Sequence, residues 1–577
     1  MFMVAAVFSI LAVIAIFVFL ILKGAPAFMK IGVIDFVFGD VWNSNSADTF
    51  LQPLVGKYGI FTMIVGTIFA TVGAIAVGGT LGYFTAIYLA KFCPKRLKKA
   101  LNAFINLLAG IPSVVYGFFG MKVLLPALGG LSSNGSGGGL LAVSLILGIM
   151  ILPTIVALSK TSIEAVPESY YEGARALGVS HEQAIFKAIV PAARSGIVAS
   201  FILGIGRALG ETMAVVMVAG NSVTIPNGLF SSFRTMTANI VLEMGYAGEV
   251  QMSALIATGV VLLFFIVVVN LLFHLISSNS EKENKTKKSS RRYFEVNFSR
   301  LKTEKIGKVL SVVATSIATI SLLTVVGFIL INGLPYINWT FLSSEFEYGG
   351  AVTIFPSIVA TLMLIVLCIA LAIPLGIMTA IYLNEYTKRE SRIIKVIRMA
   401  IDVLAGIPSI VYGLFGMIFF CDLLGLGTSI IAGALTVSIM VLPTVVRTTE
   451  ESLRSVPNSF REGSLALGAG KLRTLFKVVL PCALPGILSA VILSMGRVVS
   501  ESAPLMFTMG ASLKPMPNGF NSGGTTLAVA LYKLAGEGLH INEAYATACV
   551  LIIIVLILNT LSEFVVKKLQ KKQLGEN

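Results

Sequence analysis

The chain has 577 residues, of which 56% are hydrophobic and only 12% are charged, whereas soluble globular proteins carry about 25% charged residues. This composition excludes a disordered chain and does not fit a single soluble domain. The remaining charge is basic, with 43 Lys and Arg against 28 Asp and Glu. Uncharged runs such as 1–22 are long enough for a helix to cross a bilayer core of about 30 Å. We therefore predict an all-α, polytopic membrane protein.

The cysteines and histidines predict neither a disulfide framework nor a metal site. The five cysteines lie far apart, none forms a Cys-x-x-Cys pair, and the three histidines have no ligand-like spacing to them. The basic segment that opens a signal peptide is absent before the first apolar run. Residues 1–22 are therefore predicted to be the first transmembrane helix.

An internal repeat organises the chain. Three motifs occur twice in the same order: LAGIPSVVYGFFG (108–120) and LAGIPSIVYGLFG (404–416), EGARALG (172–178) and EGSLALG (462–468), and GRALGE (206–211) and GRVVSE (496–501). The first pair is identical at 11 of 13 positions, and the copies are 296 or 290 residues apart. We predict two homologous halves, 1–276 and 307–577, joined by a solvated, basic linker at 277–306.

Hydropathy predicts six membrane spans in each half. They lie near 1–22, 59–90, 101–128, 138–158, 196–219 and 251–276, and near 307–332, 355–383, 398–424, 428–446, 487–509 and 541–566. An even number of spans gives both halves the same orientation, as in a parallel repeat. Pro112 and Pro408 predict kinks in the third span of each half.

Basic loops predict the orientation in the cell membrane. Lys91–Lys99 carries five basic residues and no acid, whereas Gly129–Gly137 carries no charge. Lys and Arg concentrate on the cytoplasmic side of membrane proteins. Both termini and the linker are therefore expected to be cytoplasmic.

Two long polar segments, Ser159–Ser195 and Arg447–Leu484, follow the fourth spans and are expected to stay in the cytoplasm. Each predicts two helices joined at a glycine, with proline at the start of the first helix and at the end of the second. These positions are Pro167, Gly178 and Pro191 in the first copy and Pro457, Gly468 and Pro481 in the second. Ser180 and Gln183 predict a capping box. The pattern fits either a knob that docks on a partner or an ordinary loop with interfacial helices.

The same segments resemble the EAA motif of ATP-binding-cassette (ABC) importer permeases. The matching residues are Glu172, Gly173, Ala174, Gly178 and Pro191, and Glu462, Gly463, Ser464, Gly468 and Pro481. Small residues replace alanine at three of these positions, Gly173, Gly463 and Ser464. The resemblance implies the type I ABC importer fold, in which this segment forms the coupling helix that contacts the ATPase. The LAGIPS motifs resemble the phosphate-specific branch, with a PstC-like first half and a PstA-like second half.

This resemblance implies the partners. A cytoplasmic ABC ATPase dimer that binds ATP and Mg²⁺ would contact Thr161–Pro191 and Glu450–Pro481, and an extracytoplasmic phosphate-binding protein would deliver the substrate. Membrane lipid surrounds the chain, a phosphate-signalling regulator is a further candidate partner, and no nucleic acid is expected. The sequence lacks the phosphate-binding motif G-x-x-x-x-G-K-[ST], so we expect a permease subunit without cofactor or enzymatic activity of its own.

Four charges occupy the predicted fifth spans: Arg207 and Glu211, and Arg497 and Glu501. A charge near the bilayer centre costs a few kcal/mol or more unless it is paired or hydrated. One explanation is an i,i+4 ion pair within each helix. The other is a polar path between the halves, in which guanidinium groups bind an oxyanion. Hydroxyls of Thr212, Ser500 and Ser502 would add hydrogen bonds, and the resemblance implies that the matching Arg and Glu matter for transport.

The sequence favours an importer of inorganic phosphate and leaves alternatives open. Within the ABC class, the substrate could be another oxyanion, such as sulfate or molybdate, or an amino acid. An ion-coupled secondary transporter would use Glu211 and Glu501 as proton carriers. A membrane scaffold for signalling would use the polar segments to bind a regulator.

Overall fold

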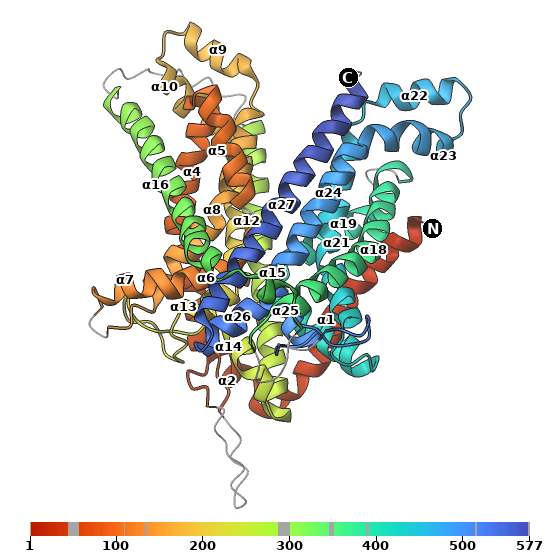
Figure 1. The fold of residues 1–577 in the computed structure, drawn as a ribbon. Coiled ribbons are helices and arrows are strands. Elements are labelled where there is room, and N and C mark those ends of the chain that lie inside the picture. The colour runs from red at the N-terminus through yellow and green to blue at the C-terminus, as the bar shows by residue number, and fades with distance from the viewer. Residues whose placement is uncertain are drawn as a thin grey trace, which may run out of the picture. The chain divides into compact units, whose positions relative to one another are not determined.

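The computed structural model describes residues 2–43, 57–108, 110–132, 135–286, 301–345, 351–387, 392–513 and 516–574 (Figure 1). These ranges contain helices and two isolated β-bridges but no β-strand. Nine helices among them are long and apolar enough to cross a membrane, or eleven if each of two bent pairs is one span. The predicted all-α, polytopic fold is confirmed.

The chain forms two compact units whose boundaries differ from those of the sequence repeats. One unit contains residues 28–329, and the other contains 1–27 and 330–577. Most of helix α1 (Phe2–Ile31) thus packs with the second repeat, and most of α16 (Leu301–Gly333) packs with the first. The ring of Phe19 in α1 lies 6.3 Å from that of Phe415, and the ring of Phe328 in α16 lies 5.8 Å from that of Phe119. The first helix of each repeat is therefore exchanged.

Helix α8 (Leu140–Glu164) forms the centre of the 28–329 unit and packs against α3, α4 and α12. Small residues allow close approach of the backbones, since a Cβ atom at Gly78 would lie 2.2 Å from the Gly148 carbonyl oxygen. The other helices of this unit are α2 (Val33–Phe38), α3 (Phe61–Ala74), α4 (Thr80–Ile87), α5 (Lys95–Leu108), α6 (Ser113–Phe119), α7 (Leu125–Gly129), α9 (Glu168–Ala176), α10 (His181–Ala184), α11 (Val190–Ala192), α12 (Arg194–Gly210), α13 (Met213–Val218), α14 (Met236–Glu243) and α15 (Glu249–Thr286).

Helix α21 (Ile430–Ser455) has the same central place in the other unit and packs against α18 and α24, while α24 packs against α27. The remaining helices are α17 (Trp339–Ser343), α18 (Phe355–Glu385), α19 (Arg392–Gly406), α20 (Ser409–Gly416), α22 (Asn458–Ala466), α23 (Lys471–Thr474), α24 (Leu480–Ser500), α25 (Ala503–Thr508), α26 (Leu527–Glu537) and α27 (Ile541–Leu574).

The predicted linker is helical at both ends that the structure describes, because α15 runs to Thr286 and α16 begins at Leu301. Residues 287–300 of the linker lie outside the described residues.

The kinks predicted at Pro112 and Pro408 are present as breaks in the helix. Each proline has an extended backbone and immediately precedes a new helix, α6 or α20. In the second repeat, Val396–Gly406 and Ser409–Leu423 are bent by 98° relative to each other. The break follows from proline itself, which lacks an N–H group and disfavours a helical conformation in the preceding residue.

We predict that Gly78→Ala destabilises the 28–329 unit, because the added Cβ atom would collide with the backbone of α8 at Gly148. Overpacking of this kind costs about 1–3 kcal/mol. The measurement is the apparent melting temperature in detergent, which should fall. Gly327→Ala is the matched control, since no atom lies within 4 Å of a Cβ at that helical position. Equal melting temperatures for the two variants would contradict the close packing of α8.

Candidate functional site

The fifth span of each repeat is broken at its glutamate. Helix α12 ends at Gly210, Glu211 has φ −70° and ψ 135°, and α13 begins at Met213. The second repeat has the same break, with Glu501 extended at φ −79° and ψ 135° between α24 and α25. The prediction of continuous helices over 196–219 and 487–509 is therefore wrong at this point. Hydropathy did not reveal the break because the sequence stays apolar on both sides.

Each arginine is held by a threonine from the central helix of its own unit. The Arg207 Nη1 atom donates to Thr154 Oγ1 at 2.9 Å, and the Arg497 Nη1 atom donates to Thr444 Oγ1 at 3.4 Å. The two threonines follow prolines inside α8 and α21 and are 290 residues apart, as are the two arginines. The two threonines were not predicted from the sequence, although the Leu-Pro-Thr repeated at the same spacing is a signal that indicates them.

The carboxylates do not neutralise the two arginines in the same way. Among the described residues no carboxylate lies within 4 Å of Arg207, and Glu211 Oε1 instead accepts from the backbone N–H of Ala214 at 3.3 Å. Arg497 Nε and Glu501 Oε1 are 3.8 Å apart. The expected i,i+4 ion pair is therefore absent in the first repeat and present only as a long contact in the second. The guanidinium groups therefore keep N–H donors beyond those bound to threonine.

Two of the three predicted hydroxyls, those of Thr212 and Ser500, are engaged with the backbone rather than with the arginines. Thr212 Oγ1 donates to the Gly210 carbonyl at 3.3 Å, and Ser500 Oγ donates to the Gly496 carbonyl. Thr212 and Ser502 are both only 2% exposed. In this conformation the arginines supply the available polar groups near the break.

Two helical hairpins lie at the ends of α8 and α21, formed by α9 with α10 and by α22 with α23 (Figure 1). Gly178 and Gly468 both have φ +81°, a left-handed conformation that favours glycine. The predicted glycine after the first helix is thus confirmed in both copies. Neither α9 nor α22 has a buried residue, and Leu177 and Leu467 are 81% and 90% exposed. Each hairpin thus presents an exposed leucine immediately before its glycine.

The EAA-like residues divide into an outer set and an inner set. The outer set is exposed and comprises Glu172, Gly173, Gly178, Glu462, Gly463 and Gly468. Ala174 and Ser464 are half-buried, and the Ser464 and Thr474 hydroxyls lie 2.9 Å apart across the second hairpin. In the second hairpin the inner position therefore joins α22 to α23, and the outer set is accessible in both hairpins.

The second helix of each hairpin is anchored to its unit by apolar side chains. Ile185 and Ile189 are buried in a cluster with Ile87, and Leu475 and Val479 are buried with Ile381. Burial of such a side chain contributes about 1.5–3 kcal/mol. The Ser180–Gln183 capping box is confirmed, with reciprocal hydrogen bonds of 3.1 and 3.2 Å.

The predicted helix end holds at Pro191, since the helix stops one residue later at Ala192, but it is wrong at Pro481, where the helix continues. A π-helical turn precedes each proline, at Ile185–Ile189 and Leu475–Val479. Such turns re-satisfy backbone groups around a proline. In the second repeat helix therefore runs without a break over Lys471–Ser500, which connects the hairpin directly to Arg497. In the first repeat the chain bends by 68° between His181–Ala192 and Arg194–Gly210.

The family of binding-protein-dependent transport system inner membrane components matches residues 78–282 and 372–574. The chain belongs to this family. It is a multi-pass inner membrane protein with two copies of the family's domain.

Named relatives cover either the whole chain or one repeat. A phosphate transport system permease protein PstA homolog of Mycoplasma pneumoniae is 27% identical over 94% of this chain and 93% of its own length. A probable ABC transporter permease protein, YqgH, of Bacillus subtilis is 39% identical over 44% of this chain and 82% of its own length. The phosphate transport system permease protein PstC of Haemophilus influenzae is 34% identical over 44% of this chain and 85% of its own length.

We predict that Gly178→Ala loosens the first hairpin. A residue other than glycine pays about 1–2 kcal/mol in a left-handed conformation, which corresponds to a roughly 5- to 30-fold change in a local opening equilibrium. Hydrogen–deuterium exchange of residues 168–184 should rise accordingly. Gly173→Ala is the matched control, because that glycine is helical and equally open. Faster exchange in the control than in Gly178→Ala would contradict this role.

Proposed function

We propose that this chain is the fused permease of an ATP-driven importer of inorganic phosphate. Residues 1–276 would act as the PstC-like half and residues 307–577 as the PstA-like half. Membership in the family and the names of the relatives support this proposal. The observation that carries the chemistry is the duplicated arginine, with one half-buried guanidinium per repeat held by a threonine.

The arginines suit a tetrahedral oxyanion. A guanidinium group presents several N–H donors in a planar fork and stays charged at any physiological pH. Arg207 has no carboxylate partner among the described residues, and the closest approach of Arg497 to Glu501 is 3.8 Å. Donors therefore remain for an anion, while Glu211 and Glu501 keep the local charge low enough for release. The same chemistry would accept sulfate or molybdate, so transport assays need these anions as competitors.

The hairpins suit an ATPase that supplies the energy. Both present an open glycine corner beside an exposed leucine, Leu177 or Leu467. The second hairpin continues into its arginine-bearing helix without a break, and the first precedes its arginine-bearing helix across a 68° bend. We place them in the cytoplasm, together with both chain termini, where a dimer of ABC ATPase subunits would bind ATP and Mg²⁺. A phosphate-binding protein would deliver the anion on the opposite side, and a phosphate-signalling regulator is a further partner.

Arg207→Ala and Arg497→Ala should each reduce ATP-dependent uptake of radiolabelled phosphate at least tenfold, because each removes a donor group from the anion path. The complex with the ATPase should still assemble. Arg194→Ala is the control, since it removes an exposed arginine from the same helix as Arg207. Full uptake in both site variants would refute the anion-path role, and competition by sulfate but not phosphate would change the assigned substrate.

Leu177→Asp and Leu467→Asp should reduce co-purification of the ATPase, because each places a charge in an apolar contact that would be desolvated on binding. Glu172→Ala and Gly178→Ala should weaken the same association. Leu539→Asp provides the control, because Leu539 is 83% exposed but lies outside both hairpins. Undiminished ATPase recovery with all four hairpin variants would mean that the hairpins are not its docking site.

A further inference from the structure

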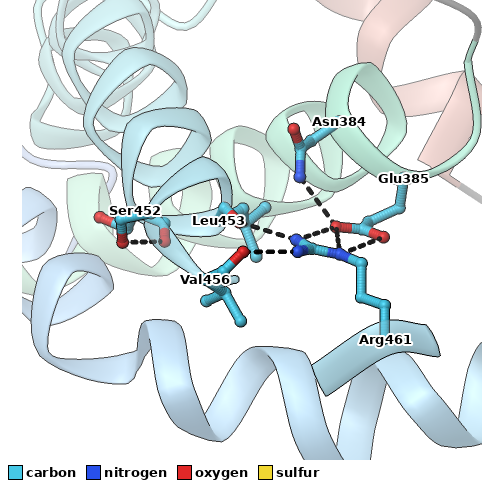
Figure 2. Close-up of polar contacts among 7 residues, drawn as sticks. Asn384, Glu385, Ser452, Leu453, Val456 and Arg461 are labelled. Carbon is cyan, nitrogen blue, oxygen red and sulfur yellow. Dashed lines mark hydrogen bonds and ion pairs between the residues drawn. The ribbon is translucent and has the colours of Figure 1, made fainter. Parts of the chain in front are cut away.

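Besides its apolar anchor, the second hairpin is connected to its unit by the side chain of one arginine in α22 (Figure 2). Arg461 lies in α22, and its Nη2 atom is 2.8 Å from Glu385 Oε1. Its Nε atom lies 3.2 and 3.3 Å from the two oxygens of the same carboxylate. Asn384 Nδ2 donates to Glu385 Oε1 at 2.8 Å, which fixes the carboxylate from the other side. Both charged side chains are about four-fifths buried, at 17% and 18% exposure.

The remaining donors of Arg461 bind the end of α21. Its Nη1 atom donates to the Val456 carbonyl and its Nη2 atom to the Leu453 carbonyl, both at 2.7 Å. Carbonyl groups at a helix C-terminus lack partners within the helix, and a cation there is favourable. Arg461 thus joins the ends of α18 and α21 to the first helix of the hairpin. We call Arg461 and Glu385, with these two carbonyls, the hairpin clamp.

The first repeat cannot form this clamp. The sequence TAIYL occurs at 85–89 and again at 379–383, so Lys91 corresponds to Glu385. The EAA-like motifs place Tyr171 opposite Arg461. A lysine and a tyrosine replace the carboxylate and the guanidinium, and the ion pair is lost.

The first hairpin is fastened by different contacts. Tyr171 Oη lies 2.8 Å from His181 Nδ1, a hydrogen bond that joins α9 to α10, and Tyr171 also packs against the apolar cluster that contains Ile87. Lys308 of α16 donates to Glu182 at 3.2 Å and lies over the ring of Phe92 at 5.6 Å. The Lys308 side chain is 47% exposed, and exposed pairs of this kind contribute little. This ion pair is therefore weaker than the one in the clamp.

We propose that Arg461 is a positioning residue that couples the second hairpin to the membrane helices, so that the two hairpins transmit ATPase motion unequally. This inference rests on the proposed function. A bidentate, largely buried pair holds its geometry better than a single exposed contact. A push on α22 must therefore move the ends of α18 and α21 with it, whereas α9 can shift more independently.

The test uses the full chain with its ATPase and binding protein in proteoliposomes, and it measures inorganic phosphate moved per ATP hydrolysed. Arg461→Ala and Glu385→Gln should each lower this ratio at least fivefold while ATPase recovery stays unchanged. The double variant should be no worse than Arg461→Ala, since both changes remove one interaction. Arg461→Lys keeps the positive charge but lacks the planar set of guanidinium donors, and it should give an intermediate ratio.

Two control variants should keep the ratio of phosphate moved to ATP hydrolysed within twofold of wild type. Tyr171→Phe removes the hydroxyl at the corresponding position of the first hairpin, and Arg454→Ala removes a nearby exposed arginine while Glu450 keeps its bond to Arg398. A normal ratio in Arg461→Ala, or an equal loss in Tyr171→Phe, would overturn the proposal. Loss of ATPase recovery in parallel with transport would also overturn it, because Arg461 would then be a docking residue.

A second measurement separates the clamp from the substrate assignment. Hydrogen–deuterium exchange of 458–466 should rise at least fivefold in Arg461→Ala, while exchange of 168–176 stays unchanged. If the wild-type complex hydrolyses ATP without moving phosphate, the assignment of phosphate as substrate is wrong. The hydrogen–deuterium exchange result then tests the clamp by itself. Equal exchange in Arg461→Ala and wild type would overturn it.

Discussion

Backbone groups without partners are costly in apolar surroundings, and the break in the fifth span of each repeat is built around that constraint. In the first repeat the Glu211 carbonyl accepts a hydrogen bond from Thr237 Oγ1 at 2.8 Å, and the Glu211 side chain accepts from the Ala214 N–H. The carboxylate that the sequence placed beside Arg207 is therefore used on the backbone. The arginine is left with a threonine, and its remaining charge is what makes the site suited to an anion.

In each repeat the helix that ends at this break follows the hairpin along the chain. In the second repeat the helix from Lys471 to Ser500 carries Arg497 one turn before its end. The helix passes Pro481 because a π-helical turn precedes it. A helix is stiff along its axis, so a displacement at the hairpin reaches the arginine without an intervening loop. The 68° bend in the first repeat makes that connection less direct.

Sequence reasoning found what depends on local pattern and missed what depends on packing. The repeat, the apolar spans, the Ser180–Gln183 capping box and the left-handed glycines follow from residues close together in the sequence. Hydropathy does not show where an apolar helix is interrupted, and it did not predict the break at Glu211. It also does not tell which repeat a uniformly apolar helix will join. The exchange of α1 and α16 was therefore not predictable, whereas the partner of Arg207 was, from the repeated Leu-Pro-Thr.

The two copies share the arginine–threonine pair of the fifth span but differ in the hairpin clamp. Both arginines of the fifth spans keep their threonine partners at identical spacing, while the hairpin position that is Arg461 in one copy is Tyr171 in the other. The charge at the facing position is reversed, from Glu385 to Lys91. A simple loss of the pair would have required only one change. Both residues of the clamp differ between the copies, whereas the arginine–threonine pair is the same in both. This pattern is expected if the two halves share one anion path but receive the motion of the ATPase differently.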